Sequence, residues 1–519
     1  MRDVSTTGRP RRVVARARDL AAQNKLFAGA LGIGALLRLL AVLGYPGALF
    51  FGGDSYVYLG AALRPQPNLS KSTGYSLFLR LLLPFHSLTL VVVLQHLMGL
   101  ADAVLIYALL RHNRVAKKWA AIATLPVLLD GYMIEDEHLI MTEALFTFLI
   151  VLALVLVLWR PKLSWWVALI AGLLTGYAVI VHTEGAVVLI LPLLLLVRDW
   201  RTVRGWVAAI VMGVGCLIPV GAYVSWFHHE NGSWNVTLSD GFYLWGRVSS
   251  FADCAVIKPT GRQALVCPTA PIAKRTPPGN YVWHAPQTHK DLVPTGGPVT
   301  DANNKLLTSF AIHAIEAQPL GYAKAVVKGV LLSFGFPRIA YPGEGTVWFY
   351  DFHLHYYVAG KYTELPPKNH SWIAGGTAYG DWLSYGHQAP GVVHEIFAAP
   401  IIAYQRLVFT YGPLLALIFL LGLGGVVRIR RPVRLRLRPF PVYWERRGTS
   451  MIPWITAVAL LVAPVAVADF DYRYLLPVLP VACLAAGLGF APARRKSTPD
   501  QPQPPAEDPI ETTVPDSVA

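Results

Sequence analysis

Residues 139–158 read LIMTEALFTFLIVLALVLVL, and Glu143 is the single charged residue in this stretch. An α-helix rises about 1.5 Å per residue, so roughly 20 apolar residues cross the hydrocarbon core of a bilayer. Apolar runs of similar character recur along the chain, at 27–47, 88–110, 119–134, 165–181, 186–197, 206–227, 398–427, 451–468 and 475–491. The sequence therefore predicts an all-α polytopic membrane protein with about ten transmembrane spans.

The composition of the 519-residue chain supports this prediction, because 54% of the residues are hydrophobic and 14% are charged. Soluble domains carry about 25% charged residues. The net charge of +15 would suggest nucleic acid in a soluble protein, but most of the Lys and Arg residues gather in short segments between the apolar runs. These segments are 1–25, 111–118, 160–162, 198–204, 428–447 and 494–496. Short cytoplasmic loops collect basic residues, so we expect both termini in the cytoplasm, a lipid bilayer around the helices and no nucleic-acid partner.

The apolar runs and the loops between them divide the chain into five regions. They are a basic cytoplasmic N-terminus (1–25), a seven-helix transmembrane module (26–227), an extracytoplasmic loop domain (228–397), three C-terminal transmembrane helices with a basic cytoplasmic loop (398–495) and a cytoplasmic tail (496–519). The tail is Pro-rich, acidic and nearly free of aromatic residues, which predicts disorder. The loop domain is rich in Trp, Tyr, Gly and Pro, which predicts a folded domain of mixed structure. Whether its segment 320–340 is embedded in the membrane is left open.

Two of the four cysteines lie in the predicted exterior loop domain. Cys254 and Cys267 are thirteen positions apart, and a structural disulfide in an oxidising compartment is the favoured interpretation. A zinc site is less favoured because His284 and His289 lack the usual paired spacing. Cys216 lies in an apolar run, as does Cys483, and both are read as small buried hydrophobic residues.

The first exterior loop carries a carboxylate and a cation close together. Residues 50–79 read FFGGDSYVYLGAALRPQPNLSKSTGYSLFL, with Asp54 directly after the first span and Lys71 near the end of the loop. A solvated helix cap is the plain alternative for Asp54. The pairing of an acid that can take a proton with a cation that can bind an anion favours a functional interpretation.

The second exterior loop is acidic. Residues 130–148 read DGYMIEDEHLIMTEALFTF, with Glu137 at the predicted membrane surface and Glu143 about one turn inside the apolar run. Ionisable groups inside a membrane are costly and commonly functional, which makes Glu143 a catalytic candidate. Glu137, in the same acidic loop, is a second candidate. An acidic helix N-terminus favoured by the helix dipole accounts for the acids at 135–137, but poorly for Glu143.

Further charged residues fall on the same predicted side of the membrane. His182 lies between two apolar runs, and Arg473 lies between the last two, where it could pair with Asp469 or Asp471. Arg38 lies within the first run, where snorkelling toward a membrane face is the favoured interpretation. Together, exterior acids surrounded by cations suit a ligand with a phosphate head and a lipid tail, because cations bind the phosphate and a carboxylate handles a proton.

Two motifs carry a resemblance to a known family. The sequence GDSYVYL at 53–59, followed by KSTGYSLFLRLLLP at 71–84, resembles the GT-C glycosyltransferases, in the group of protein O-mannosyltransferases, aminoarabinose (ArnT-like) transferases and RgtA/B/C/D-like proteins. The resemblance implies a GT-C-like helix bundle in which Asp54 is the catalytic carboxylate. It also implies that Lys71, with Gly74 and Tyr75, positions the donor phosphate. Arg473 matches an Arg-Tyr motif before the last helix.

The sequence departs from the family pattern at a few positions. Ser72 and Thr73 replace the usual prolines, Ser55 stands where mannosyltransferases have a second acid, and His182 stands where many members have arginine. By position, His182 joins Lys71, Arg473 and Tyr75 as an expected donor-phosphate ligand.

The resemblance implies an inverting enzyme of the plasma membrane whose active site faces the extracytoplasmic side. It would move a hexosyl or pentosyl group from a polyprenyl-phosphate-linked donor to a hydroxyl acceptor, which is a cell-envelope glycan, a lipid or a protein. No cofactor is required, although oligosaccharyltransferases of the same fold raise a divalent-metal option at Glu135, Glu137 and His138. The alternatives are a secondary transporter or lipid-linked-glycan flippase, and a non-catalytic envelope assembly protein.

Overall fold

The computed structural model describes residues 22–284, 299–354, 357–358, 361–362, 373–386, 393–427 and 444–492. In these ranges the regular structure is helical, apart from one antiparallel pairing of two-residue strands, β1 (Tyr357–Val358) and β2 (Lys361–Tyr362). The predicted all-α class therefore agrees with the structure, and the described part of the loop domain is more helical than the mixed structure expected. Three parts of the prediction lie outside the described residues: the first 21 residues of the basic N-terminus, residues 428–443 of the basic cytoplasmic loop and the tail 496–519.

The N-terminal part of the chain forms the longest helices of the molecule and several short ones between them. The elements are α2 (Lys25–Gly44), α3 (Gly52–Leu63), α4 (Gly74–Leu82), η1 (Leu83–Phe85), α5 (Leu88–His112), α6 (Lys117–Leu129), α7 (Gly131–Asp136), α8 (Glu143–Trp159), α9 (Trp165–Val181), η2 (Thr183–Ile190), α10 (Leu191–Asp199) and α11 (Val203–Asn231).

Short helices follow, and long helices return at the end of the chain. The elements are α12 (Asp240–Ser249), α13 (Cys254–Ile257), η3 (Gly261–Val266), η4 (Ile272–Lys274), α14 (Pro278–His284), α16 (Asp301–Ala317), α17 (Pro319–Leu332), α18 (Glu344–Trp348), α19 (Ala378–Gly386), α20 (Glu395–Leu407), α21 (Gly412–Val427), α22 (Trp444–Val467), η5 (Tyr472–Tyr474) and α23 (Leu475–Gly489).

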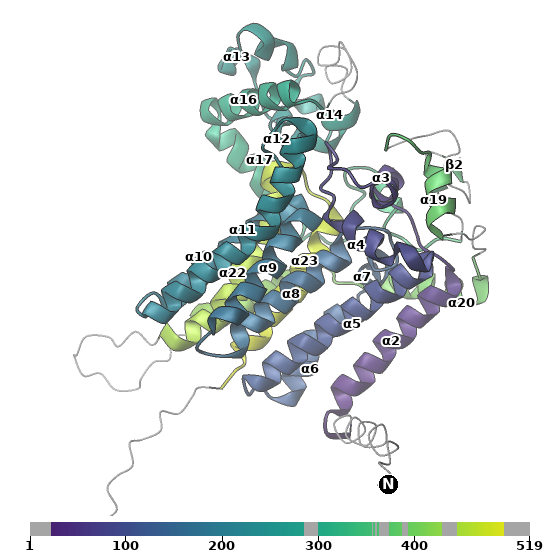
Figure 1. Ribbon diagram of the computed structural model, residues 1–519, viewed down its shortest axis with the longest axis vertical. Coiled ribbons are helices and arrows are strands. Elements are labelled where there is room, and N and C mark those ends of the chain that lie inside the picture. Colours follow the sequence, from purple (N-terminus) through teal and green to yellow (C-terminus); the bar gives the residue numbers. More distant parts are fainter. Residues whose placement is uncertain are drawn as a thin grey trace, which may run out of the picture.

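The long helices lie side by side as a bundle, and many of the shorter helices gather at one of its ends (Figure 1). Helices α12, α13, α14, α16 and α17 lie at that end, and so do α3, α4 and α7. The turn between α5 and α6 lies at the opposite end, where the ring of His112 stacks on Trp159 at a centroid distance of 4.5 Å. The basic turn 111–118, which the sequence assigns to the cytoplasm, is therefore separated by the length of the bundle from the helices that gather at the other end.

Fewer helices qualify as membrane spans than the sequence predicts. Among the described residues five helices are long and apolar enough to cross a membrane, or six if the bent pair α20 and α21 counts as one span. Each of the ten apolar runs coincides with a helix or a pair of helices, but a count of ten spans is not confirmed. The run 119–134 is divided because the carboxylate of Asp130 accepts hydrogen bonds from the N–H groups of Tyr132 and Met133 and starts α7. The run 186–197 is partly 3₁₀ helix.

Small residues allow α9 and α11 to pack closely together. On α9, Gly172 packs against the carbonyl oxygen of Met212, and Gly176 packs against that of Cys216, both on α11. A Cβ atom at either glycine would collide with these backbone oxygens. Glycines four positions apart are the usual means by which apolar helices approach closely in a membrane.

A buried ionic network connects α2, α5, α6 and the end of α7. The guanidinium of Arg38 on α2 donates to both carboxylate oxygens of Glu137, at 2.6 and 2.7 Å, and to the carbonyl oxygen of Leu128 at 2.9 Å. The ring of His96 on α5 lies 2.8 Å from Glu137, and all three side chains are at most 4% exposed. The predicted snorkelling of Arg38 is therefore wrong, because the side chain points into the bundle toward a carboxylate 99 positions away.

The loop domain has a small core of its own. Trp245 and Phe310 are fully buried within it, and the indole N–H of Trp245 donates to the carbonyl oxygen of Val266 at 2.8 Å. The structure joins Cys254 to Cys267 beside this core, with a Cα–Cα distance of 6.4 Å. The segment 320–340 contains most of α17, whose 14 residues extend about 21 Å, shorter than a hydrocarbon core of about 30 Å.

Candidate functional site

Asp54 lies in the first turn of α3, at the end of the bundle that carries the short helices. The hydroxyl of Ser55 accepts a hydrogen bond from the N–H of Phe51 at 2.7 Å, and Gly52 adopts a positive φ of 45°. Glycine reaches this left-handed conformation without the penalty that a side chain would impose. The tight entry into α3 places the Asp54 carboxylate at a helix N-terminus, where the helix dipole favours a negative charge.

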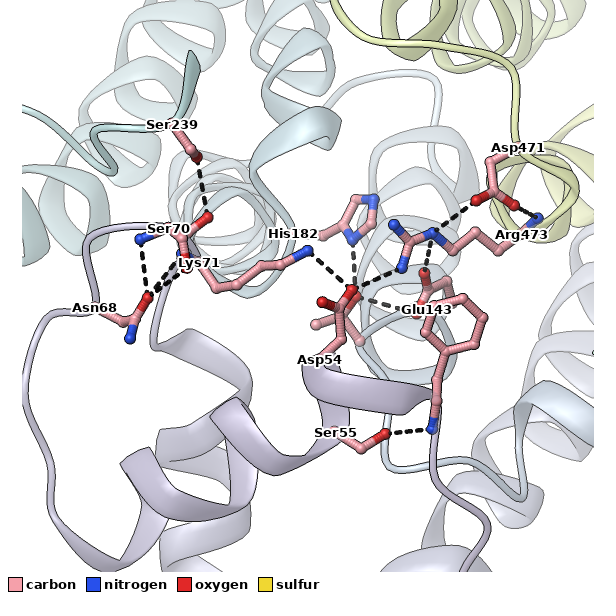
Figure 2. A network of polar contacts seen from close by, with 12 residues as sticks. Asp54, Ser55, Asn68, Ser70, Lys71, Glu143, His182, Ser239, Asp471 and Arg473 are labelled. Atoms are coloured by element: carbon pink, nitrogen blue, oxygen red, sulfur yellow. Dashed lines mark hydrogen bonds and ion pairs between the residues drawn. The ribbon is translucent and has the colours of Figure 1, made fainter. Parts of the chain in front are cut away.

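Lys71 reaches Asp54 from the loop between α3 and α4 (Figure 2). Its ammonium nitrogen lies 2.9 Å from Oδ2 of Asp54. The backbone is fixed beneath it, because Oδ1 of Asn68 accepts hydrogen bonds from the N–H groups of Ser70 and Lys71 at 2.9 and 3.1 Å. The hydroxyl of Ser239, just before α12, donates to the carbonyl oxygen of Ser70 at 3.0 Å. The loop domain therefore contacts the segment that holds the lysine.

Arg473 reaches the same carboxylate from the other side, on the short helix η5 between α22 and α23. Its Nη1 lies 3.1 Å from Oδ2 of Asp54, as Figure 2 shows. The guanidinium carbon lies 5.2 Å from the ring centroids of Phe51 and Tyr474, within the range of cation–π attraction. Asp471 fixes the backbone, since its Oδ1 accepts from the N–H of Arg473 at 3.2 Å and from the hydroxyl of Tyr350.

Two cations therefore share one oxygen of one carboxylate, and the charges of the three groups depend on one another. The Asp54 side chain is 23% exposed, against 14% for Lys71 and 12% for Arg473. Burial alone would raise the pKa of Asp54, but the charges of Lys71 and Arg473 and their hydrogen bonds lower it to about 2. Burial would lower the pKa of Lys71, yet the Asp54 carboxylate holds it well above its usual value. All three groups are therefore charged near neutral pH.

Glu143 and His182 lie next to this triad and are linked through Thr142. The hydroxyl of Thr142 donates to Oε2 of Glu143 at 3.1 Å and lies 2.7 Å from Nδ1 of His182. The other oxygen of Glu143 faces Nε of Arg473 at 3.9 Å. Within the described residues, neither of those two buried atoms has a hydrogen-bond partner. Glu143 therefore acts on Arg473 mainly through charge.

The remaining predicted site residues lie elsewhere. Glu137 is paired with Arg38 in the bundle core, so it does not face Asp54. Tyr75 is fully buried, and its hydroxyl donates to Oε1 of Gln95 at 2.6 Å. Helix α4 thus turns the ring of Tyr75 into the bundle, and the bond to Gln95 does not favour the phosphate contact expected from the sequence. Its neighbour Gly74 serves close packing against the backbone of Ile180.

The metal option at Glu135, Glu137 and His138 does not correspond to a formed site. Across the described ranges, no group of three or more His, Cys, Asp or Glu side chains is arranged to hold a metal ion. The nitrogens of His138 face other partners, with Nε2 2.9 Å from the carbonyl oxygen of Tyr45 and Nδ1 3.1 Å from His96. Consecutive residues here point in different directions because α7 ends at Asp136 and the chain turns.

Sequence reasoning missed the residues that hold the triad in place. Asn68 and Ser239 fix the loop of Lys71, and Tyr350 fixes Asp471. Asn68 had a local signal, because asparagine side chains cap turns two or three residues on. No comparable signal linked Ser239 or Tyr350 to the site, since both lie far along the chain from their partners.

Comparison of the sequence with protein-family models finds no match, and comparison with curated proteins finds none. Among solved structures, the chain is similar to the S. cerevisiae protein O-mannosyltransferase Pmt1–Pmt2 complex bound to the sugar donor, at 16% sequence identity and a TM-score of 0.33. The similarity covers 44% of this chain and 36% of that chain, so it spans about a third of the length of the yeast protein.

Proposed function

We propose that this chain is a membrane glycosyltransferase that moves a sugar from a polyprenyl-phosphate-linked donor to a hydroxyl acceptor outside the membrane. The observation that carries the proposal is the meeting of Lys71 and Arg473 at the carboxylate of Asp54. This arrangement combines two groups that can hold a phosphate with one that can accept a proton. The motifs around 53–59 and 71–84, which resemble the GT-C glycosyltransferases, support the same reading.

The two cations suit the phosphate of the donor. An ammonium and a guanidinium form charge-assisted hydrogen bonds to phosphate oxygens, and the planar guanidinium can engage two oxygens at once. Because the pKa of Lys71 is held above its usual value, the lysine carries its charge at physiological pH. Both cations would also stabilise the negative charge that builds on the phosphate as the sugar leaves.

Asp54 would act as the general base. The acceptor hydroxyl attacks the anomeric carbon from the face opposite the phosphate, and its proton passes to a carboxylate oxygen of Asp54. A carbon–oxygen bond to the acceptor forms while the bond between the anomeric carbon and the phosphate oxygen breaks. The electron pair of that bond remains on polyprenyl phosphate, and the product has the inverted configuration.

The loop domain would contribute to the choice of acceptor. Ser239 at the start of α12 contacts the loop of Lys71, and Arg247 on α12 lies 3.8 Å from Asp469, four residues before Arg473. The hydroxyl of Tyr341 donates to the same Asp469 at 2.7 Å. The domain is thus connected to both cation-bearing segments, on the side from which an acceptor could approach.

The proposal is tested by donor use. Purified full-length protein would be incubated with polyprenyl-phosphate hexoses and pentoses, and in parallel with the same sugars on nucleotides, while release or transfer of the sugar is followed. We expect turnover with one or more lipid-linked donors only. Lys71→Ala should lose roughly tenfold to a hundredfold, the equivalent of one hydrogen bond to a charged group. The matched control is Lys305→Ala, at a lysine that is 75% exposed on α16. Use of nucleotide sugars, or no turnover with any donor, would contradict the proposal.

A further inference from the structure

The contacts of Asp54 raise a chemical problem for its role as a base. Lys71 and Arg473 both bind the same atom, Oδ2, at 2.9 and 3.1 Å. A carboxylate held by two cations is a weak base, because its negative charge is already compensated. The lowered pKa of Asp54, about 2, expresses the same effect. The groups that suit a phosphate are thus engaged with the group that must take the proton.

We propose that the Asp54 carboxylate and the phosphate of a lipid-linked ligand compete for Lys71 and Arg473, so that phosphate binding releases Asp54 to act as the base. This inference rests on the proposed function and adds to it an order of events. The phosphate would take over the two charge-assisted contacts now made to Oδ2. Once they are gone, burial would raise the proton affinity of the carboxylate, since the cations no longer offset it.

The surroundings of the two cations allow this exchange without a large rearrangement. The backbone of Lys71 is fixed by Asn68, whereas the ammonium is at the end of a flexible four-carbon stem. Arg473 is retained from its other side, because Nε lies 3.6 Å from Oδ2 of Asp471 and 3.9 Å from Oε1 of Glu143. Only the tips of the two side chains need to change partners, and the arginine keeps carboxylates on both sides during the exchange.

Glu143 acquires a defined role in this scheme, as a positioning residue. It compensates part of the charge of Arg473 while the guanidinium exchanges Asp54 for the phosphate, without itself contacting the acceptor. The polar pair of Thr142 and His182 orients its second oxygen. A buried arginine left with one carboxylate fewer would otherwise lose part of its charge compensation.

The consequence is an ordered reaction in which the base becomes effective after the donor has bound. If the Asp54 carboxylate were a strong base before the donor bound, it would bind a proton or another cation and would not be free to accept the proton of the acceptor. Competition between Asp54 and the phosphate also predicts an effect on binding that would not arise if Asp54 merely lay beside the phosphate site. Removing the charge of Asp54 should strengthen phosphate binding, because the internal competitor is gone.

The test is equilibrium binding of farnesyl phosphate to detergent-solubilised full-length protein by calorimetry, with inorganic phosphate and farnesol as separate ligands. Asp54→Asn should bind farnesyl phosphate about tenfold more tightly than the wild type, since each pKa unit of charge interaction corresponds to a factor of ten. Asp54→Ala should change the affinity in the same direction. Inorganic phosphate should show a similar gain if the headgroup alone competes, while farnesol affinity should not change. Glu230→Gln, at an exposed glutamate on α11, is the control.

The outcomes separate the two claims. Unchanged or weaker binding of farnesyl phosphate by both Asp54 variants, with binding weakened in Lys71→Met, would overturn the competition but leave the phosphate site standing. Equal affinity of wild type and Lys71→Met would overturn the phosphate site and the proposed function with it. A parallel gain for farnesol would show that the substitutions act on binding of the lipid tail, and it would also overturn the competition.

Discussion

Replacing Glu137 with glutamine should destabilise the protein while leaving the chemistry of the folded enzyme largely intact. The sequence presents Glu137 as a catalytic candidate, but the structure pairs it with Arg38 at 2.6 Å and places His96 at 2.8 Å. Arg38 and Glu137 are each 3% exposed. Glutamine keeps the shape of the side chain and removes its charge, so the guanidinium of Arg38 would remain buried without a counter-ion.

The magnitude follows from the burial and geometry of this pair. Breaking a buried ion pair by removing one partner costs about 3–5 kcal/mol. The Glu137 carboxylate also packs directly against Gly99 on α5. The double variant Arg38→Met/Glu137→Met removes both charges together, and replacing a buried pair by apolar groups of similar volume is often neutral or stabilising. The double variant should therefore be more stable than Glu137→Gln.

The assay is thermal unfolding in detergent, combined with sugar transfer per folded molecule. Glu230→Gln provides the same substitution at an exposed position and should unfold like the wild type. We expect Glu137→Gln to unfold at a lower temperature and to keep transfer within a few-fold below that temperature. The reasoning is refuted if Glu137→Gln unfolds like the wild type and yet loses transfer, because Glu137 would then act in the reaction.

Three other predictions follow from the site and the loop domain. Arg473→Ala should weaken farnesyl phosphate binding about tenfold, and Arg473→Lys should restore it only in part because an ammonium lacks the planar fork of arginine; normal binding by the alanine variant would make Arg473 an ordinary charge. Cys254 and Cys267 should both resist alkylation in non-reduced protein, as mass spectrometry would show, and two modified thiols would disprove the disulfide. A cysteine introduced at Lys305 should react with a membrane-impermeant reagent in intact cells, whereas one at Arg114 should react only after the cells are opened; the reverse pattern would contradict the predicted sidedness.

Most of the helices could be predicted from the apolar runs, because polar segments separate one run from the next. The number of membrane-spanning helices could not be predicted, since local capping decides where each helix ends. Asp130 is one charged residue at the edge of an apolar run, but its side chain caps α7 and accepts from the N–H of Thr410 at 2.6 Å. A contact 280 positions away has no signature in the run itself.

The candidate site divides in the same way. Asp54 and Lys71 lie 17 positions apart in one loop, so a local motif was enough to place them together. Arg473 is 419 positions from Asp54. The two were connected by their shared predicted side of the membrane and by the likeness of the Arg-Tyr motif to the GT-C family. The direction of the Arg38 side chain was misread, and the pairing of Glu137 was missed, because each residue was interpreted without its partner. A buried charge can be functional or structural, and the partner across the bundle decides which.

Single-turnover transfer by Asp54→Asn tests the central claim most directly. Donor and acceptor would be supplied at saturating concentration, and donor binding would be measured on the same preparation. Asparagine is nearly isosteric with aspartate but cannot take a proton, so we predict donor binding at least as tight as in the wild type. The transfer rate should fall by about 10²–10⁴, the usual contribution of a general base. Glu143→Gln should lose less, because Glu143 contacts Arg473 rather than the acceptor. A near-normal rate for Asp54→Asn, together with abolished transfer in Glu143→Gln, would contradict the account and assign the base to Glu143.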